Sequence, residues 1–232
     1  MTGLTQQRGA VSVVFADGSA GDYDLVVGAD GIHSTVRGLA VSRTAPSYAG
    51  AVSWRSIIAA RPRGVDHLMV FTGERRYFGL VPVGGGHTYG FAGLDGEPFH
   101  DPPAGRLDRL RQHFRGFGPP VTSYLAALAC DEQIHFGPIE SIDLDSWHAG
   151  RVVLIGDAAH ASPPHLGEGG AMAIEDAIVL AELLHAADTI EDAFGRFQAR
   201  RKPRTGYVQQ QSTLAAGVSV ANETRSAQER MI

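Results

Sequence analysis

The sequence predicts an α/β fold, and three observations indicate it. Two apolar runs, Asp24 to Gly28 and Arg151 to Ile155, are each followed by a glycine-bearing loop and a helical pattern. Between them, short runs bounded by Gly and Pro predict a mostly antiparallel sheet. A further helical segment begins at Ile190. We therefore expect the 232 residues to form an α/β part and a β-rich part, followed by C-terminal helices.

The opening residues predict a β-hairpin that leads into a buried strand. Val11 to Phe15 alternates as a strand does, and residues 16–19 supply turn-forming side chains. The run Tyr23 to Gly28 is the expected second arm, and its apolar residues suggest a strand covered on both faces. It ends at Ala29-Asp30-Gly31, and ligands favour that end of a strand. Ser34 is expected to cap the helix that starts there.

The middle of the chain predicts an antiparallel sheet followed by two short helices. The glycines at 84–86 lie between two strand-like runs and predict a hairpin turn. The expected strands are Ala51 to Ile58, His67 to Thr72, Tyr77 to Val83 and Thr88 to Leu94, and the expected helices are Leu107 to Phe114 and Val121 to Ala129.

The remaining third again has the order strand, loop, helix. After Arg151 to Ile155, the loop Gly156 to Gly170 precedes a predicted helix from Ala171 to Ala187. A further helix from Ile190 to about residue 221 is expected to be interrupted at Pro203, which lacks an N–H donor.

The composition excludes several classes of protein. With 44% hydrophobic and 19% charged residues, the chain lacks the signature of intrinsic disorder. Its net charge of −5 argues against a nucleic-acid-binding surface. No apolar run approaches the about 20 residues of a membrane span. The single Cys130, expected to be a buried apolar side chain, cannot form an internal disulfide, so a reducing cytoplasm fits best.

The segment from Gly150 to Ala177 carries the strongest chemical signal. A carboxylate directly after a buried strand, here Asp157, can accept hydrogen bonds from sugar-like hydroxyls, and Gly156 lets a ligand approach the backbone. The glycines of the following turn leave N–H groups unshielded at the start of a helix, where a partly anionic ligand atom is favoured. They are Gly167, Gly169 and Gly170.

This segment resembles the second FAD-contact motif of the class A flavoprotein monooxygenases, relatives of para-hydroxybenzoate hydroxylase. The resemblance implies that Asp157 binds the ribityl chain, that Pro163 and Pro164 lie near the reacting face of the flavin ring, and that the glycine turn binds its pyrimidine end. The sequence departs from the family pattern at Glu168, where glutamine is usual, and at Ala171, where asparagine is frequent.

Asp24 to Arg37 is similar to the Asp-Gly fingerprint of the same family, which serves both FAD and the pyridine nucleotide. The resemblance implies cofactor roles for Asp30, Gly31 and Arg37, although Asp30 could simply form a turn and Arg37 a structural ion pair. Trp54-Arg55 matches the salicylate-hydroxylase-like branch, so Arg55 is a candidate substrate residue, although such residues more often belong to a packed sheet. His165 in the proline-bearing loop is a further candidate. No metal site is expected, because His160 and His165 lack a third ligand nearby.

The family resemblance implies an incomplete Rossmann-like FAD-binding domain (1–43 and 143–187), a β-rich substrate domain (44–142) and a C-terminal helical segment (188–232). It implies hydroxylation, or a related epoxidation, of a small aromatic or similar molecule by FAD, NAD(P)H and O₂. No side chain is nominated as the catalytic acid or base, since the cofactor supplies the chemistry.

The sequence contains no G-x-G-x-x-G turn for the FAD pyrophosphate. Three alternatives therefore stay open. The active enzyme is longer than this sequence, or a separate chain completes it, or the chain is an inactive remnant or non-enzymatic binding protein that forms a homodimer.

Overall fold

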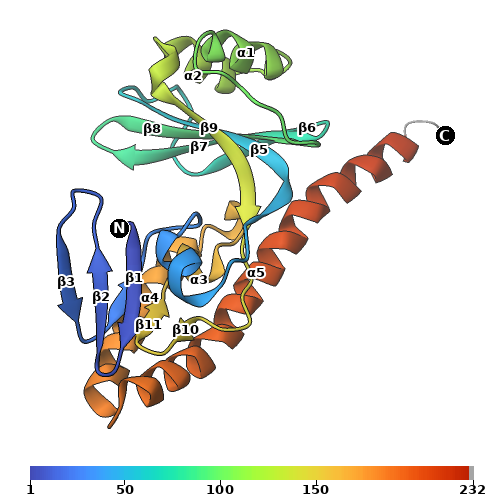
Figure 1. The fold of residues 1–232 in the computed structure, drawn as a ribbon. Coiled ribbons are helices and arrows are strands. Elements are labelled where there is room, and N and C mark those ends of the chain that lie inside the picture. Colours follow the sequence, from blue (N-terminus) through green and yellow to red (C-terminus); the bar gives the residue numbers. More distant parts are fainter. Residues whose placement is uncertain (230–232) are drawn as a thin grey trace. The chain divides into compact units, whose positions relative to one another are not determined.

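The computed structural model describes the backbone of residues 1–229 and the side chains of residues 1–216. The chain forms two compact units, the first from Met1–Ser47 and Glu140–Val218 and the second around Tyr48–Ile139. No helix in the described part of the chain is long and apolar enough to cross a membrane. The α/β class expected from the sequence is confirmed, with antiparallel sheets and long C-terminal helices (Figure 1).

The first unit opens with a three-stranded antiparallel sheet (Figure 1). Its strands are β1 (Gly3–Gln7), β2 (Ala10–Val14) and β3 (Ala20–Tyr23). The predicted hairpin turn is confirmed, but the second arm is β3, with Val11 opposite Tyr23. The strand β1, which pairs with β2, was not anticipated. The apolar run after Tyr23 does not join this hairpin, because its last residues pair in a second sheet.

The second sheet brings together the two strand–loop–helix segments. β4 (Val26–Gly28) runs parallel to β11 (Val152–Leu154), and β11 also pairs with β10 (His148–Ala149). Because parallel strands end at the same edge of a sheet, the loops after β4 and β11 emerge side by side. The strand β4 is less covered than expected, since Val27 keeps 38% of its surface exposed.

Helices complete the first unit. They are α3 (Asp157–His160), a 3₁₀ turn (Pro164–Leu166), α4 (Gly169–Ala186) and α5 (Ile190–Glu229). The expected interruption at Pro203 is wrong, because α5 continues through it. Phe194, Phe197 and Val208 lie buried along one side of α5, and burial of this side offsets the lost hydrogen bond of the proline.

The second unit is a five-stranded sheet in the order β6-β7-β8-β5-β9. Its strands are β5 (Ser47–Ile58), β6 (Met69–Gly73), β7 (Arg76–Gly84), β8 (His87–Asp95) and β9 (Ile134–Ser141). The four predicted strands and the glycine turn between β7 and β8 are confirmed, whereas β9 was not anticipated.

Two helices, α1 (Arg106–His113) and α2 (Val121–Ala127), cover one face of this sheet (Figure 1). Trp54, Phe78 and Tyr124 lie in the core between them. The expected burial of Cys130 is wrong, because it lies exposed at the start of a 3₁₀ turn, where its N–H bonds to the side chain of Gln133 at 3.2 Å.

Candidate functional site

The backbone turns sharply where β11 ends. Gly156 has φ 58° and ψ −143°, a conformation open essentially to glycine alone, and a Cβ there would lie 2.9 Å from the Cβ of Ala173. The turn leads directly into α3, whose first residue is Asp157. Asp157 is exposed and makes no hydrogen bond or ion pair with any described residue. Its carboxylate is therefore available to a ligand.

The start of α4 lies opposite this carboxylate. An ideal Cβ on Gly169 would be 3.9 Å from Asp157 Oδ1, so the absent side chain leaves room between them. Glu168 at the N-cap provides no side-chain acceptor, and the first helical bond to it comes from Met172 N at 2.9 Å. The N–H groups of the first turn thus remain available at the positive end of the helix. Acceptor and donors together suit a ligand with both hydroxyl and carbonyl groups.

The turn before α4 supplies the other predicted residues. Gly167 ends the 3₁₀ turn with φ 68°, and its N–H bonds to the Pro164 carbonyl at 3.0 Å. Pro164 and Gly170 are exposed, whereas Pro163 is buried. His165 is half-buried, and burial lowers its pKa. This turn thus leads directly into the start of α4, where Gly169 lies opposite the Asp157 carboxylate.

Asp30 has partners within the protein. Its carboxylate accepts hydrogen bonds from the N–H groups of Thr35 and Val36, at 2.7 and 3.0 Å, and from the Ser34 hydroxyl. Partial burial opposes ionisation, but these hydrogen bonds outweigh it and lower the pKa of Asp30. Ser34 also accepts from Arg37 N at 2.9 Å, which confirms it as a helix cap. Asp30 therefore stabilises the turn after β4, and Gly31 makes that turn with φ 80°.

Arg37 is buried, and its contacts are with the backbone. Its guanidinium donates to the carbonyl of Ala158 at 3.0 Å and to that of Ile32 at 2.6 Å. It therefore joins the two loops that carry the sequence motifs. A direct cofactor contact by Arg37, like the cofactor roles of the other motif residues, remains a prediction.

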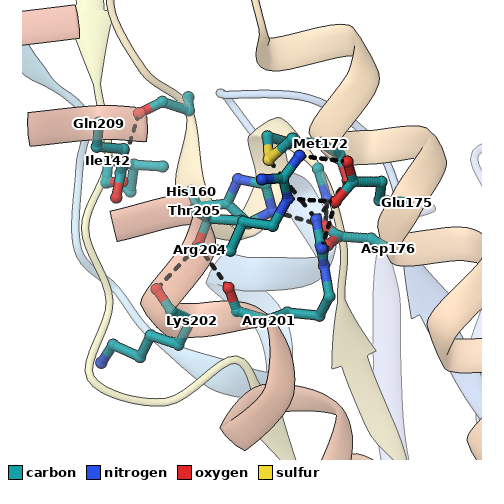
Figure 2. A network of polar contacts seen from close by, with 12 residues as sticks. Ile142, His160, Met172, Glu175, Asp176, Arg201, Lys202, Arg204, Thr205 and Gln209 are labelled. Carbon is teal, nitrogen blue, oxygen red and sulfur yellow. Dashed lines mark hydrogen bonds and ion pairs between the residues drawn. The ribbon is translucent and has the colours of Figure 1, made fainter. Parts of the chain in front are cut away.

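A buried polar network behind Asp157 was missed by sequence reasoning. His160 Nε2 and Arg201 Nε lie 2.6 and 2.7 Å from the two carboxylate oxygens of Asp176 (Figure 2). All three side chains are almost fully buried. Burial favours the neutral acid, but hydrogen bonds from His160, Gly156 and Arg201 outweigh it and lower the pKa of Asp176. The available signal was a charged pair, Glu175-Asp176, flanked on both sides by apolar residues of the same helix, since such charges need partners.

The second unit holds Arg55 on the sheet face opposite α1 and α2. Trp54 points into the core, where its indole N–H bonds to Asp101 at 2.7 Å, so the next residue, Arg55, is exposed on the other face. Arg55 makes no hydrogen bond or ion pair with a described residue. It lies directly opposite Phe91, whose ring stacks on Tyr89 with centroids 5.9 Å apart.

Tyr77 extends the same aromatic surface, with its ring centroid 6.2 Å from that of Phe91. Burial, assisted by the charge of Asp95 and by Tyr89, raises the pKa of Tyr77 to about 12, while Arg55 acts in the opposite direction. A cation beside aromatic rings is a suitable surface for a planar anion.

Comparison with known proteins identifies a family and several relatives. A family model described as an FAD binding domain matches residues 1–206. The chain is 36% identical to aurachin C monooxygenase/isomerase of Stigmatella aurantiaca over 195 residues, which cover 83% of this chain and 50% of that protein. It is 35% identical to the FAD-dependent urate hydroxylase of Klebsiella pneumoniae, over 88% of this chain and 54% of the relative.

A solved structure extends the likeness to the fold. Klebsiella pneumoniae HpxO complexed with FAD and uric acid matches with a TM-score of 0.88 and 28% identity, over 98% of this chain and 60% of that one. The chain thus spans about half the length of the curated relatives it matches.

Proposed function

The chain belongs to the FAD-binding family of the class A FAD-dependent monooxygenases, and from this premise we propose that it supplies flavin and substrate contacts for an NAD(P)H- and O₂-dependent hydroxylation of a small aromatic or related organic molecule. When bound, FAD supplies the redox chemistry of this reaction. The chain's own residues bind and orient the cofactor and the substrate.

The observation that carries the proposal is the free carboxylate of Asp157 opposite the first turn of α4. In this proposal the carboxylate accepts hydrogen bonds from the ribityl hydroxyls, and the N–H groups of Gly169 and Gly170 donate to the pyrimidine end of the flavin. Gly156 and Gly167 permit close approach of the ligand to the backbone. The donor and acceptor types present therefore fit the group.

For the substrate, we propose a planar aromatic molecule that carries an anionic oxygen. Arg55 is an exposed cation without an ion-pair partner among the described residues. In the sheet it pairs with Phe91, whose ring stacks on Tyr89. His165 is proposed as a further substrate contact. Benzoate is expected to perturb the NMR signals of this aromatic surface, and the neutral benzyl alcohol is not. Equal perturbation by both probes would contradict the assignment to Arg55.

The enzyme is proposed to work in a reducing cytoplasm, either as part of a longer chain or with a separate chain that supplies the pyrophosphate-binding turn. An exposed apolar row on α4 favours such a partner. Its two large members, Ile174 and Ile178, keep 66% and 63% of their surface exposed. A remnant that forms a homodimer through this row is the second candidate. Sedimentation velocity distinguishes the two candidates. If the second is correct, the purified chain sediments as a dimer, and Ile174→Lys converts it to a monomer.

An NMR titration of the ¹⁵N-labelled chain with FAD tests the flavin assignment. We expect shifts at Asp157 and residues 167–171 and a Kd weaker than about 1 µM, because this sequence has no pyrophosphate-binding turn. The Asp157→Ala variant should no longer reach saturation with FAD. The control is Asp188→Ala, at an exposed aspartate after the other end of α4, and it should leave the FAD titration unchanged. Identical titrations of wild type and Asp157→Ala would contradict the proposed function.

A further inference from the structure

The carboxylate of Asp176 contacts both ends of the turn that contains Asp157. Its Oδ2 accepts a hydrogen bond from the backbone N–H of Gly156 at 2.9 Å. The same oxygen lies 2.6 Å from His160 Nε2. Gly156 and His160 are the two ends of the turn that contains Asp157, so a single buried oxygen fixes both ends.

The backbone of the turn closes on itself in the same place. The carbonyl of Gly156 accepts hydrogen bonds from the N–H groups of Ala159 and His160, at 2.9 and 3.0 Å. Gly156 is therefore held through its N–H by Asp176 and through its carbonyl by α3. Asp157, the residue between these bonds, has no contact of its own to fix its direction.

Asp176 is in turn held from α5. Arg201 donates from Nε to Asp176 Oδ1 at 2.7 Å, and its Nη1 lies 2.6 Å from Glu175 Oε2 (Figure 2). Its Nη2 also donates to the carbonyl of Met172 at 3.2 Å. Because both oxygens of the Asp176 carboxylate have hydrogen-bond partners, the carboxylate is held in one orientation.

We propose that Asp176 is a positioning residue for flavin binding: through Gly156 and His160 it directs the Asp157 carboxylate toward the start of α4, and Arg201 keeps Asp176 in place. The inference rests on the proposed function, in which Asp157 binds the ribityl chain. When a ligand-binding carboxylate is displaced by about 1 Å, the affinity for the ligand falls steeply. A residue that positions the carboxylate therefore affects ligand affinity without contacting the ligand.

The test compares FAD affinity with stability in Asp176→Asn. The asparagine keeps the shape but cannot satisfy Gly156, His160 and Arg201 together. We expect it to raise the FAD Kd by about tenfold to a hundredfold. Hydrogen exchange of the Gly156 amide should accelerate in the absence of FAD, a readout that does not depend on the cofactor.

Two further variants separate positioning from stability. Val179→Ala removes core methyl groups from the same helix, and it should lower the melting temperature while changing the FAD Kd less than about threefold. The double variant Asp176→Asn/Arg201→Gln removes both buried charges, so it should recover part of the lost melting temperature without recovering FAD affinity.

The outcomes are distinct. Loss of FAD binding in proportion to melting temperature across all the variants, or unchanged affinity in Asp176→Asn, would overturn the positioning role. An unchanged rate of exchange at Gly156 would do the same. If wild type and Asp157→Ala respond to FAD identically, the proposed function itself fails, whatever Asp176 does.

Discussion

Arg37 donates a hydrogen bond to the carbonyl of Ala158 at 3.0 Å, and this bond joins residues 121 positions apart in the sequence. With the second bond to Ile32, the buried guanidinium holds the loop after β4 against the loop after β11. The two motifs that the sequence suggests for a cofactor are thus fastened to each other by a side chain that was itself predicted to touch the cofactor.

Replacing this side chain should therefore destabilise the first unit. Arg37→Met keeps the apolar stem but leaves two carbonyls without their charged donor, at a cost of about 2 kcal/mol in the free energy of unfolding. Urea denaturation followed by circular dichroism measures the change. The exposed Arg43→Met is the control and should lie within about 0.5 kcal/mol of wild type. A similar effect of both substitutions would argue against a role for Arg37 in joining the two loops.

Glu175 should make stability depend on acidic pH. Hydrogen bonds from Arg204, and then from Arg201, lower its pKa from 4.5 to about 2. A carboxylate whose pKa is lower in the folded state stabilises the protein above its unfolded pKa and loses that contribution as the pH falls through the folded pKa. The difference in stability between wild type and Glu175→Gln should thus be constant above pH 4.5 and shrink between pH 4.5 and about pH 2.

Urea midpoints measured across this range test the dependence. Glu182→Gln, which breaks an exposed pair with Arg200, is the matched control and should change stability by less than about 0.5 kcal/mol. A difference for Glu175→Gln that grows toward low pH has the wrong sign for this explanation.

Gly79 should tolerate no side chain, because a Cβ there would clash with the ring of Phe91. Gly79→Ala is expected to destabilise the second unit by about 2 kcal/mol. In a Phe91→Ala background the same substitution should cost less than about 0.5 kcal/mol, since the clashing ring is gone.

A glycine-to-alanine substitution at an uncrowded position is the control. Gly195→Ala, in the exposed part of α5 with no atom within 4 Å of the new Cβ, should instead add up to about 1 kcal/mol. Thermal unfolding of the variants measures both effects. Equal costs of Gly79→Ala in the two backgrounds would show that Phe91 is not the cause.

Pro203 should weaken the helix that carries Arg201. Its side chain is exposed, so Pro203→Ala restores a backbone donor without disturbing the core and should stabilise the protein by about 1 to 3 kcal/mol. The exposed Gln210→Ala on the same helix should change stability by less than about 0.5 kcal/mol. A lower melting temperature for Pro203→Ala would mean that the proline geometry is required.

Sequence periodicity determined much of the local structure. The apolar runs predicted β4, β11 and four strands of the larger sheet, the three glycines predicted the turn before β8, and Ser34 was correctly expected to cap a helix. These features depend on neighbours within a few residues, so the sequence contains them directly. The family was also predictable, because its motifs are contiguous.

The tertiary structure alone decided which partners the polar residues have. Asp176, Arg201 and His160 lie on separate helices. Nothing in their spacing along the sequence predicts that Arg201 and His160 both contact the buried carboxylate of Asp176. Likewise, the folded chain gives Asp30 and Arg37 partners within the protein and leaves Asp157 free. Hydrogen bonds between distant residues depend on how strands and helices pack, whereas the motif positions depend on the sequence itself.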